Sequence, residues 1–321
     1  MPRPIQGLAI AICLLALASL FVGVSDLSVM RLIAGDWSSR EELVFFASRL
    51  PRTIALLIAG AGMAVSGVLM QMLARNRFVE PSTTGTTDAA GLGMLCALLV
   101  YPDMPVFGKM VFAGVFGLGG MMLFLTILSR VPLRSAVMVP LIGLILGGII
   151  SSVTTFIAYR FDLLQSMGAW SNGDFSAVLR GRYELLWVAF ALLVLAYLTA
   201  DRFTVLGLGE AIATNLGLDF RVILYTGLVI VSLVSASVIV TAGSLPFVGL
   251  IVPNIVSMVM GDRLRQSLPW IALSGGVLVL ACDLLGRLVI APFEIPVGSV
   301  LGVLGSLFFI GMLIGKRQRL G

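Results

Sequence analysis

Two arginines, Arg49 and Arg52, flank Pro51 just before a long apolar run. Proline suits the first turn of a helix, so the pattern predicts a membrane helix that begins at Pro51, with both arginines near one face and directed at the outer surface. Arginines at this depth can simply reach the lipid headgroups. A helix N-terminus repels cations, however, and basic residues are disfavoured in outer loops. A docking site for an acidic partner is therefore the functional alternative.

A second group of charges lies near the end of the chain. Asp283 and Arg287 are four residues apart and can pair along one helix face, which lowers the free-energy cost of holding an arginine near lipid. Glu294 precedes another apolar run, where a carboxylate favours a helix N-terminus. The pair can serve structure alone or belong to a functional site. An ion- or proton-coupled secondary transporter would use Asp283, Glu294 or Asp174 as a relay.

The loop at residues 201–221 contains a short helix-forming stretch between glycines. Glutamate favours the start of a helix, alanine favours its interior and glycine favours its end. The stretch predicts a short helix across the cytoplasmic face, which another protein could use as a lever. The alternative is a plain surface loop. The residues concerned are Gly207, Gly209, Glu210, Ala211, Ala213 and Gly217.

Several classes of chemistry are excluded by residue type. The 321 residues include no histidine, so imidazole catalysis and Ser-His-Asp triads are ruled out. Cys13, Cys96 and Cys282 lie far apart in apolar runs and fit no metal or redox spacing. Neither Lys109 nor Lys316 stands in a phosphate-binding G-x-x-x-x-G-K-[ST] loop. We therefore predict no catalytic residue, metal or cofactor in this chain, and any ATP and magnesium must be bound by a separate ATPase.

The elements that position these residues are those of a very apolar chain. Hydrophobic residues make up 59% of it and charged residues 12%, against roughly 25% charged in a soluble domain. This composition predicts an all-α polytopic membrane protein with a single transmembrane domain over residues 1–321. The basic residues are scattered, without the stripe that a nucleic acid partner requires.

Apolar runs divide the chain into about ten spans, each compared with the ~20 residues that a helix needs to cross the hydrocarbon. The runs at 89–101 and 246–260 are too short to cross alone, which predicts broken or re-entrant helices. Basic residues are more frequent in the loops on the side of both termini, so both termini are predicted to be cytoplasmic. The spans are 7–24, 51–73, 89–101, 107–128, 137–159, 183–200, 222–241, 246–260, 269–291 and 296–315.

Glycines four residues apart allow helices to pack closely. They occur in the fifth and tenth spans, at Gly143 and Gly147 and at Gly298 and Gly302. Packing within the subunit is the simpler interpretation, but a subunit interface or a pathway wall would use the same residues. Residues 243–254 contain two glycines and two prolines seven apart, so they cannot form one regular helix.

Six segments, taken in order, carry a family resemblance. They are Arg49 to Thr53, Ser66 to Gln71, Arg75 to Pro81, Gly207 to Gly217, Phe247 to Asn254 and Glu294 to Gly298. Together they resemble the FecCD/vitamin B12-type permeases of bacterial ABC importers, although Asn254 stands where histidine is frequent. Within that family, the stretches most similar to the branch that imports catecholate siderophores such as petrobactin and anguibactin are Arg75 to Pro81, Tyr183 to Leu186 and Leu268 to Trp270.

The resemblance implies a type II ABC importer architecture in the bacterial cytoplasmic (inner) membrane. Two permease subunits would surround a central pathway, as a heterodimer of related chains or, alternatively, a homodimer. Two cytoplasmic ATPase subunits and an extracytoplasmic siderophore-binding protein would complete the importer. The resemblance also implies that Arg49, Arg52 and Arg287 meet acidic residues of the binding protein. The segment 207–217 would be the coupling helix for the ATPase, and the fifth and tenth spans would line the pathway or the dimer seam.

Overall fold

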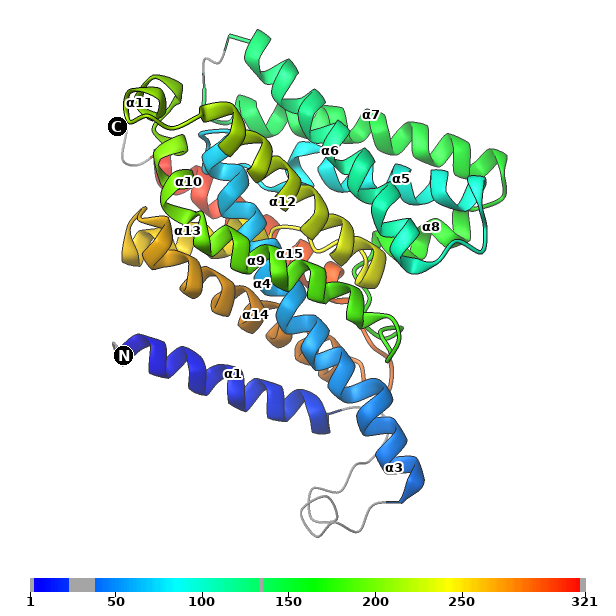
Figure 1. Cartoon of the computed structure of the whole chain (residues 1–321). Helices are drawn as coiled ribbons and strands as arrows, with labels where there is room; N and C mark the ends of the chain where they lie inside the picture. Colours follow the sequence, from blue (N-terminus) through cyan, green and yellow to red (C-terminus); the bar gives the residue numbers. More distant parts are fainter. Residues whose placement is uncertain (1–2, 23–37, 133–134, 318–321) are drawn as a thin grey trace.

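The computed structural model describes residues 3–22, 38–132 and 135–317, and these are helical without any β-strand. Figure 1 shows the helices arranged around α4, which lies in the middle of the bundle. The elements are α1 (Arg3–Phe21), α3 (Ser39–Val44), the π-helical turn η1 (Phe45–Arg49), α4 (Leu50–Leu73), the 3-10 turn η2 (Pro81–Thr84), α5 (Thr86–Val100), α6 (Val106–Arg130), α7 (Met138–Arg160), α8 (Leu164–Ser171), the 3-10 turn η3 (Tyr183–Leu185), α9 (Leu186–Leu198), α10 (Ala200–Gly207), α11 (Glu210–Asn215), α12 (Phe220–Ala242), α13 (Val248–Met260), α14 (Leu264–Val289) and α15 (Val297–Arg317).

The chain is a multi-pass membrane protein. Within the described ranges, five helices are long and apolar enough to cross a membrane: the continuous helix Ser39–Leu73, α6, α7, α12 and α14. The pair α9 and α10 also qualifies, but it is bent by 67°, and the span predicted at 183–200 ends at this bend. Shorter apolar helices lie at Ile10–Phe21, Thr86–Val100, Val248–Met260 and Val297–Met312.

Close backbone contacts fix the position of α4 in the bundle. α4 packs against α14, α12, α13 and α9, and most of its side chains are buried. Gly60 faces Gly275 of α14, and Gly67 faces Gly249 of α13, so closely that an added side chain would overlap the neighbouring backbone. Residues without side chains allow two helix axes to approach to this degree.

Pro51 lies in the first turn of α4, as predicted, but η1 joins α3 to α4 without a break, so the helix is continuous from Ser39 to Leu73. Proline has no N–H to donate to the carbonyl four residues earlier, which belongs to Ala47, and its ring crowds that carbonyl. The π-helical turn η1 widens the helix just before the proline. The carbonyl of Ala47 instead accepts the backbone N–H of Arg180 at 3.0 Å. A proline can therefore lie inside this helix because another segment supplies the missing donor.

The predicted break within residues 243–254 is confirmed, since α12 and α13 are separate helices. Pro253 nevertheless lies inside α13, where it leaves the carbonyl of Gly249 without its helical donor. The side-chain Nε2 of Gln71 on α4 donates to this carbonyl at 3.2 Å. The same contact between α4 and α13 thus combines glycine packing with a hydrogen bond that replaces the one lost to proline.

We expect Gly67→Ala to destabilise the bundle, because the new methyl group would overlap the backbone of Gly249 and overpacking of this kind costs about 1 to 3 kcal/mol. Thermal unfolding in detergent measures the effect. Gly148→Ala on α7 is the matched control, since nothing lies within 4 Å of its added methyl group and alanine is the better helix former. Equal midpoints for the two variants would contradict the proposed close contact.

Candidate functional site

A cluster of charged side chains joins α4, α14 and the turn before α15 at one end of the bundle. The Nη2 of Arg52 lies 2.7 Å from Oδ1 of Asp283 and 2.8 Å from Oε2 of Glu294. Arg287 pairs with the other carboxylate oxygen of Asp283 across one turn of α14. The predicted pairing of Asp283 with Arg287 is confirmed. Asp283 additionally holds an arginine from a second helix, which the local spacing did not predict.

The end of α1 contributes neutral acceptors to this charge cluster. Arg287 donates from Nη1 to the carbonyls of Ser19 at 3.1 Å and Val22 at 2.9 Å, and from Nη2 to the Ser19 hydroxyl at 2.7 Å. Arg49 also donates to the carbonyl of Val22. The last carbonyls of a helix lack intrahelical donors and carry partial negative charge. The two arginines therefore satisfy groups that α1 itself leaves unpaired.

The exposed position predicted for Arg49 and Arg52 is wrong, and Arg287 is buried with them. Arg49 is 8% exposed and Arg287 4%, and the side chain of Arg52 is 12% exposed. Two features cover these arginines: the helix that precedes Pro51 and the end of α1, which contacts Arg287. Neither feature can be predicted from the residues next to the arginines. Asp174, the third carboxylate of the relay hypothesis, is not among the ion-pair partners of Arg52 and Arg287 within the described residues, and it accepts hydrogen bonds from the backbone and hydroxyl of Ser176.

Asp283→Ala should lower the free energy of unfolding by about 3 to 5 kcal/mol, because it leaves two buried guanidinium groups without their shared carboxylate. Asp262→Ala is the control, since it removes an exposed ion pair with Arg77 that is expected to contribute at most about 1 kcal/mol. Thermal unfolding of both variants in the same detergent measures the difference.

A double variant, Asp283→Leu with Arg287→Leu, should recover part of the lost stability, because it replaces the buried pair with apolar side chains and leaves Arg52 bound to Glu294. The single variants Asp283→Leu and Arg287→Leu are measured beside it. If the loss of unfolding free energy in the double variant equals the sum of the losses in the two single variants, the pairing of these side chains does not account for the loss.

The short helix predicted between glycines is confirmed at the opposite end of α4. α11 begins after Gly209, with φ of +111°, and ends before Gly217, with φ of +76°. Both backbone conformations favour glycine over residues with side chains. Ala213 is the one residue of α11 that is fully buried, so one face of this short helix rests on the bundle and the other is open.

The open face of this segment carries an apolar stripe. Leu208, Ile212 and Leu216 are spaced four residues apart and are 61%, 44% and 63% exposed. Ile212 and Leu216 share one face of α11 and its C-cap, Leu208 lies just before the break in the helical backbone at Gly209, and α11 is not among the membrane-spanning helices. A row of exposed apolar side chains outside the lipid is typical of a contact surface for another protein. The four-residue spacing of Ile212 and Leu216 was the signal in the sequence for this surface.

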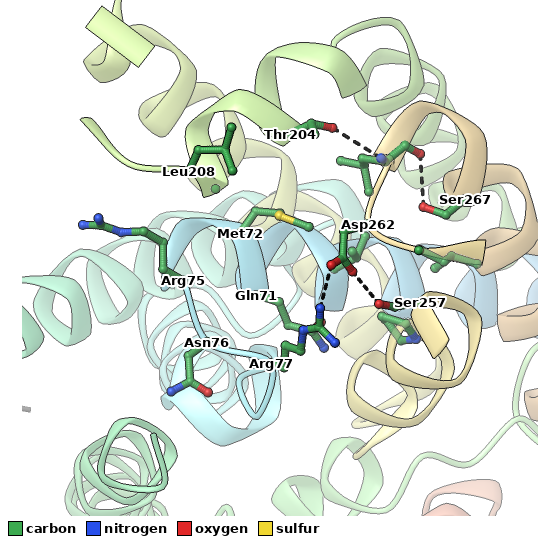
Figure 2. Close-up of a pocket in the computed structure, with 16 residues that line it drawn as sticks. Gln71, Met72, Arg75, Asn76, Arg77, Thr204, Leu208, Ser257, Asp262 and Ser267 are labelled. Atoms are coloured by element: carbon green, nitrogen blue, oxygen red, sulfur yellow. Dashed lines mark hydrogen bonds and ion pairs between the residues drawn. The ribbon is translucent and has the colours of Figure 1, made fainter. Parts of the chain in front are cut away.

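A cavity of about 240 Å³ lies between this segment and the end of α4. Figure 2 shows Arg77 and Ser257 directed at Asp262 on one side of it, and Thr204 and Leu208 on the other. Arg77 Nη2 lies 2.6 Å from Oδ2 of Asp262. The cavity is closed toward α4 by Met72, whose sulfur contacts Gly207 so closely that a side chain there would overlap it. The segment from Gly207 to Gly217 therefore contacts the last turn of α4 through Gly207.

The turn after α4 is held by hydrogen bonds at every step. Arg75 has φ of +48°, in the position after a helix where glycine is usual, and the N–H of Asn76 donates to the carbonyl of Gln71 at 2.9 Å. The side chain of Asn76 donates to Ala136 at 2.7 Å. Asn254 of α13 donates to the carbonyl of Arg77 at 2.9 Å. The segment from Arg75 onward is thus a fixed part of the fold.

Glu80 links the same segment to the start of α13, a role that sequence analysis did not assign. It is wholly buried, and its Oε1 accepts the backbone N–H of Phe247, the residue before α13, at 2.7 Å. A carboxylate at a helix N-terminus is favoured by the helix dipole. Burial raises the pKa of the Glu80 carboxyl to about 7, despite the hydrogen bonds donated by Ser82 and the backbone of Phe247. Its place in the 75–81 motif was the available signal.

The FecCD transport family matches residues 8–315, which is almost the whole chain. The chain belongs to the FecCD transport family. It is 48% identical over 313 residues to the petrobactin import system permease protein YclN of Bacillus subtilis, covering 98% of each chain. It is 40% identical over 300 residues to the ferric-anguibactin transport system permease protein FatD of Vibrio anguillarum, covering 94% of this chain and 95% of that one.

A solved structure supports the same relationship for this FecCD chain. The fold matches an inward-facing conformation of a metal-chelate type ABC transporter with a TM-score of 0.80 and 27% identity, covering 98% of this chain and 99% of that one. Proteins of this family are permeases, and ATP hydrolysis belongs to a separate subunit.

The glycines singled out in the fifth and tenth spans of this FecCD permease have different surroundings. Gly143 and Gly147 on α7 pack against η2 and the start of α5, and Gly298 packs against the backbone of Asn172. These three glycines therefore serve packing within the subunit, the simpler of the two interpretations. Gly302 on α15 has open space around it, so it is the member of the set that is available to line a pathway or a seam.

Proposed function

We propose that this chain is the permease subunit of an ATP-driven importer of ferric siderophores, of the catecholate type, in the bacterial cytoplasmic membrane. Similarity over nearly the whole chain to permeases named for petrobactin and ferric-anguibactin import carries the proposal. The chain forms the pathway with a second permease subunit, which is a related chain or a second copy. Two ATPase subunits bind ATP and magnesium, and an extracytoplasmic protein delivers the siderophore. The chain itself carries no catalytic group or cofactor.

The proposed topology has ten spans and both termini in the cytoplasm. Five long helices, one bent pair and four shorter apolar helices together supply ten apolar segments within the described ranges. The start of α1 and the end of α15 lie at the same end of the bundle as α11 (Figure 1). A coupling segment for a cytoplasmic ATPase at that end supports the cytoplasmic placement of both termini.

The segment from Gly207 to Gly217 is the proposed coupling helix for the ATPase. Its exposed stripe, Leu208, Ile212 and Leu216, offers an apolar contact of the kind that a groove on the ATPase would cover. Because Gly207 rests on Met72, a push on this segment is passed to the end of α4. Because α9, α12, α13 and α14 all pack against α4, a displacement of α4 would also displace these helices.

Replacing Ile212 and Leu216 by serine should weaken binding of the ATPase subunit by roughly tenfold or more, because two exposed apolar side chains lose their burial in the complex. Affinity between the purified ATPase and the permease in nanodiscs measures this, and thermal unfolding of the permease should not change. Asn215→Ala on the same helix is the control. An unchanged affinity for the double serine variant would remove the stripe from the contact.

Arg49, Arg52 and Arg287 are the proposed docking residues for acidic groups of the binding protein. Their burial favours an exchange of partners over a simple surface contact. Since Arg52 is already held by Asp283 and Glu294, an incoming carboxylate would replace one of these. Glu294, with 28% of its side chain exposed, is the more accessible carboxylate. Its release would free the turn that leads into α15, which couples docking to that helix.

The proposed function is tested by uptake into vesicles. The complete importer, reconstituted with its binding protein, should accumulate a ferric catecholate siderophore only when ATP is supplied on the side of the ATPase. Collapse of the membrane potential at constant ATP should leave uptake unchanged. Arrest of uptake under that condition would instead favour an ion- or proton-coupled secondary transporter.

A further inference from the structure

An apolar groove lies between α1, α4, α9 and α14. Its volume is about 490 Å³, which is within the range of pockets that hold small molecules. Figure 1 shows α1 running alongside α14 on this side of the bundle. Small side chains, among them Ala61 on α4 and Ala272 on α14, leave the space between the helices open.

The groove covers about one half of the membrane thickness. Its lining extends from Phe190 to Tyr197 on α9 and from Leu268 to Gly276 on α14, which corresponds to roughly 10 to 12 Å of helix. One leaflet contributes about half of the ~30 Å hydrocarbon thickness. The groove therefore matches the length over which one acyl chain runs through a single leaflet.

One end of the groove meets a basic edge. The guanidinium of Arg265 lies 5.9 Å from the ring centre of Tyr197 and pairs with Asp201 at 2.6 Å. Arg202 and Arg263 lie next to these residues in the sequence and are exposed. Within the described ranges, neither of the two forms an ion pair. Because Asp201 pairs with Arg265 and the neighbouring Asp262 pairs with Arg77, Arg202 and Arg263 leave this edge with a net positive charge.

We propose that this groove binds an acyl chain of an anionic phospholipid, with its headgroup at the basic edge formed by Arg202, Arg263 and Arg265. The apolar lining, with one tyrosine at its end, suits a hydrocarbon chain and offers almost nothing to a polar ligand. The arginines distinguish an anionic headgroup from a zwitterionic one, since each basic side chain near the surface adds to the attraction. The groove shares no lining residue with the cavity beside the segment from Gly207 to Gly217.

Lipid binding to the assembled importer, measured by native mass spectrometry during titration with phosphatidylglycerol or phosphatidylcholine, tests the proposal. Phosphatidylglycerol should bind more tightly. Arg202→Gln and Arg263→Gln should each reduce that preference by about fivefold. Ala61→Phe should displace either lipid from the groove, because the ring fills it.

Ala191→Phe is the matched control, since Ala191 is exposed on α9 and is not among the residues that line the groove. If Ala61→Phe prevents assembly, Ala272→Phe on α14 fills the groove from the other side. Equal binding of the two lipids, or an unchanged number of bound lipids in a folded groove-filling variant, would overturn the proposal.

Discussion

A polar group inside this bundle must find its partner within the protein, because neither lipid nor apolar side chains can supply one. The carbonyl of Ala47 is paired by Arg180, and that of Gly249 by Gln71. The carboxylate of Asp283 pairs with arginines from two helices. In each case the partner comes from a segment distant in sequence. These bonds consequently fix which helices are neighbours, and the apolar contacts fill the space between them.

α4 is the element through which the two ends of the molecule are connected. Its first turns carry Arg52 in the charge cluster, and its last turn supports the segment from Gly207 to Gly217. Between these two ends, Gly60 brings α4 into backbone contact with α14, and Gly67 brings it into backbone contact with α13. Such contacts leave little freedom for one helix to move without the others. The proposed docking and coupling surfaces lie at opposite ends of α4, so communication between them would require this kind of mechanical continuity.

Sequence patterns located the chemically informative residues but misjudged their environment. Arg49, Arg52 and Arg287 were correctly grouped, yet they are buried, because the end of α1 and a helix that continues through Pro51 surround them. Asp283 was correctly paired with Arg287 from its four-residue spacing. Its second bond, to Arg52, joins residues 231 positions apart, and no local pattern contains that information. The motif at residues 75–81 contained Glu80, but its partner Phe247 lies 167 positions away, so the bond itself could not be predicted.

Local sequence features were sufficient to predict the class of fold, the positions of the apolar helices, the break before α13 and the short helix between Gly209 and Gly217. These features follow from composition, helix propensity and the backbone preferences of glycine and proline, all of which act over a few residues. The packing of the helices decides which charges are buried and where the groove beside α1 lies. It also supplies the donors to the carbonyls of Ala47 and Gly249, which Pro51 and Pro253 leave without a helical partner. Those outcomes depend on which distant helices pack together, and that is settled by the free energy of the whole bundle.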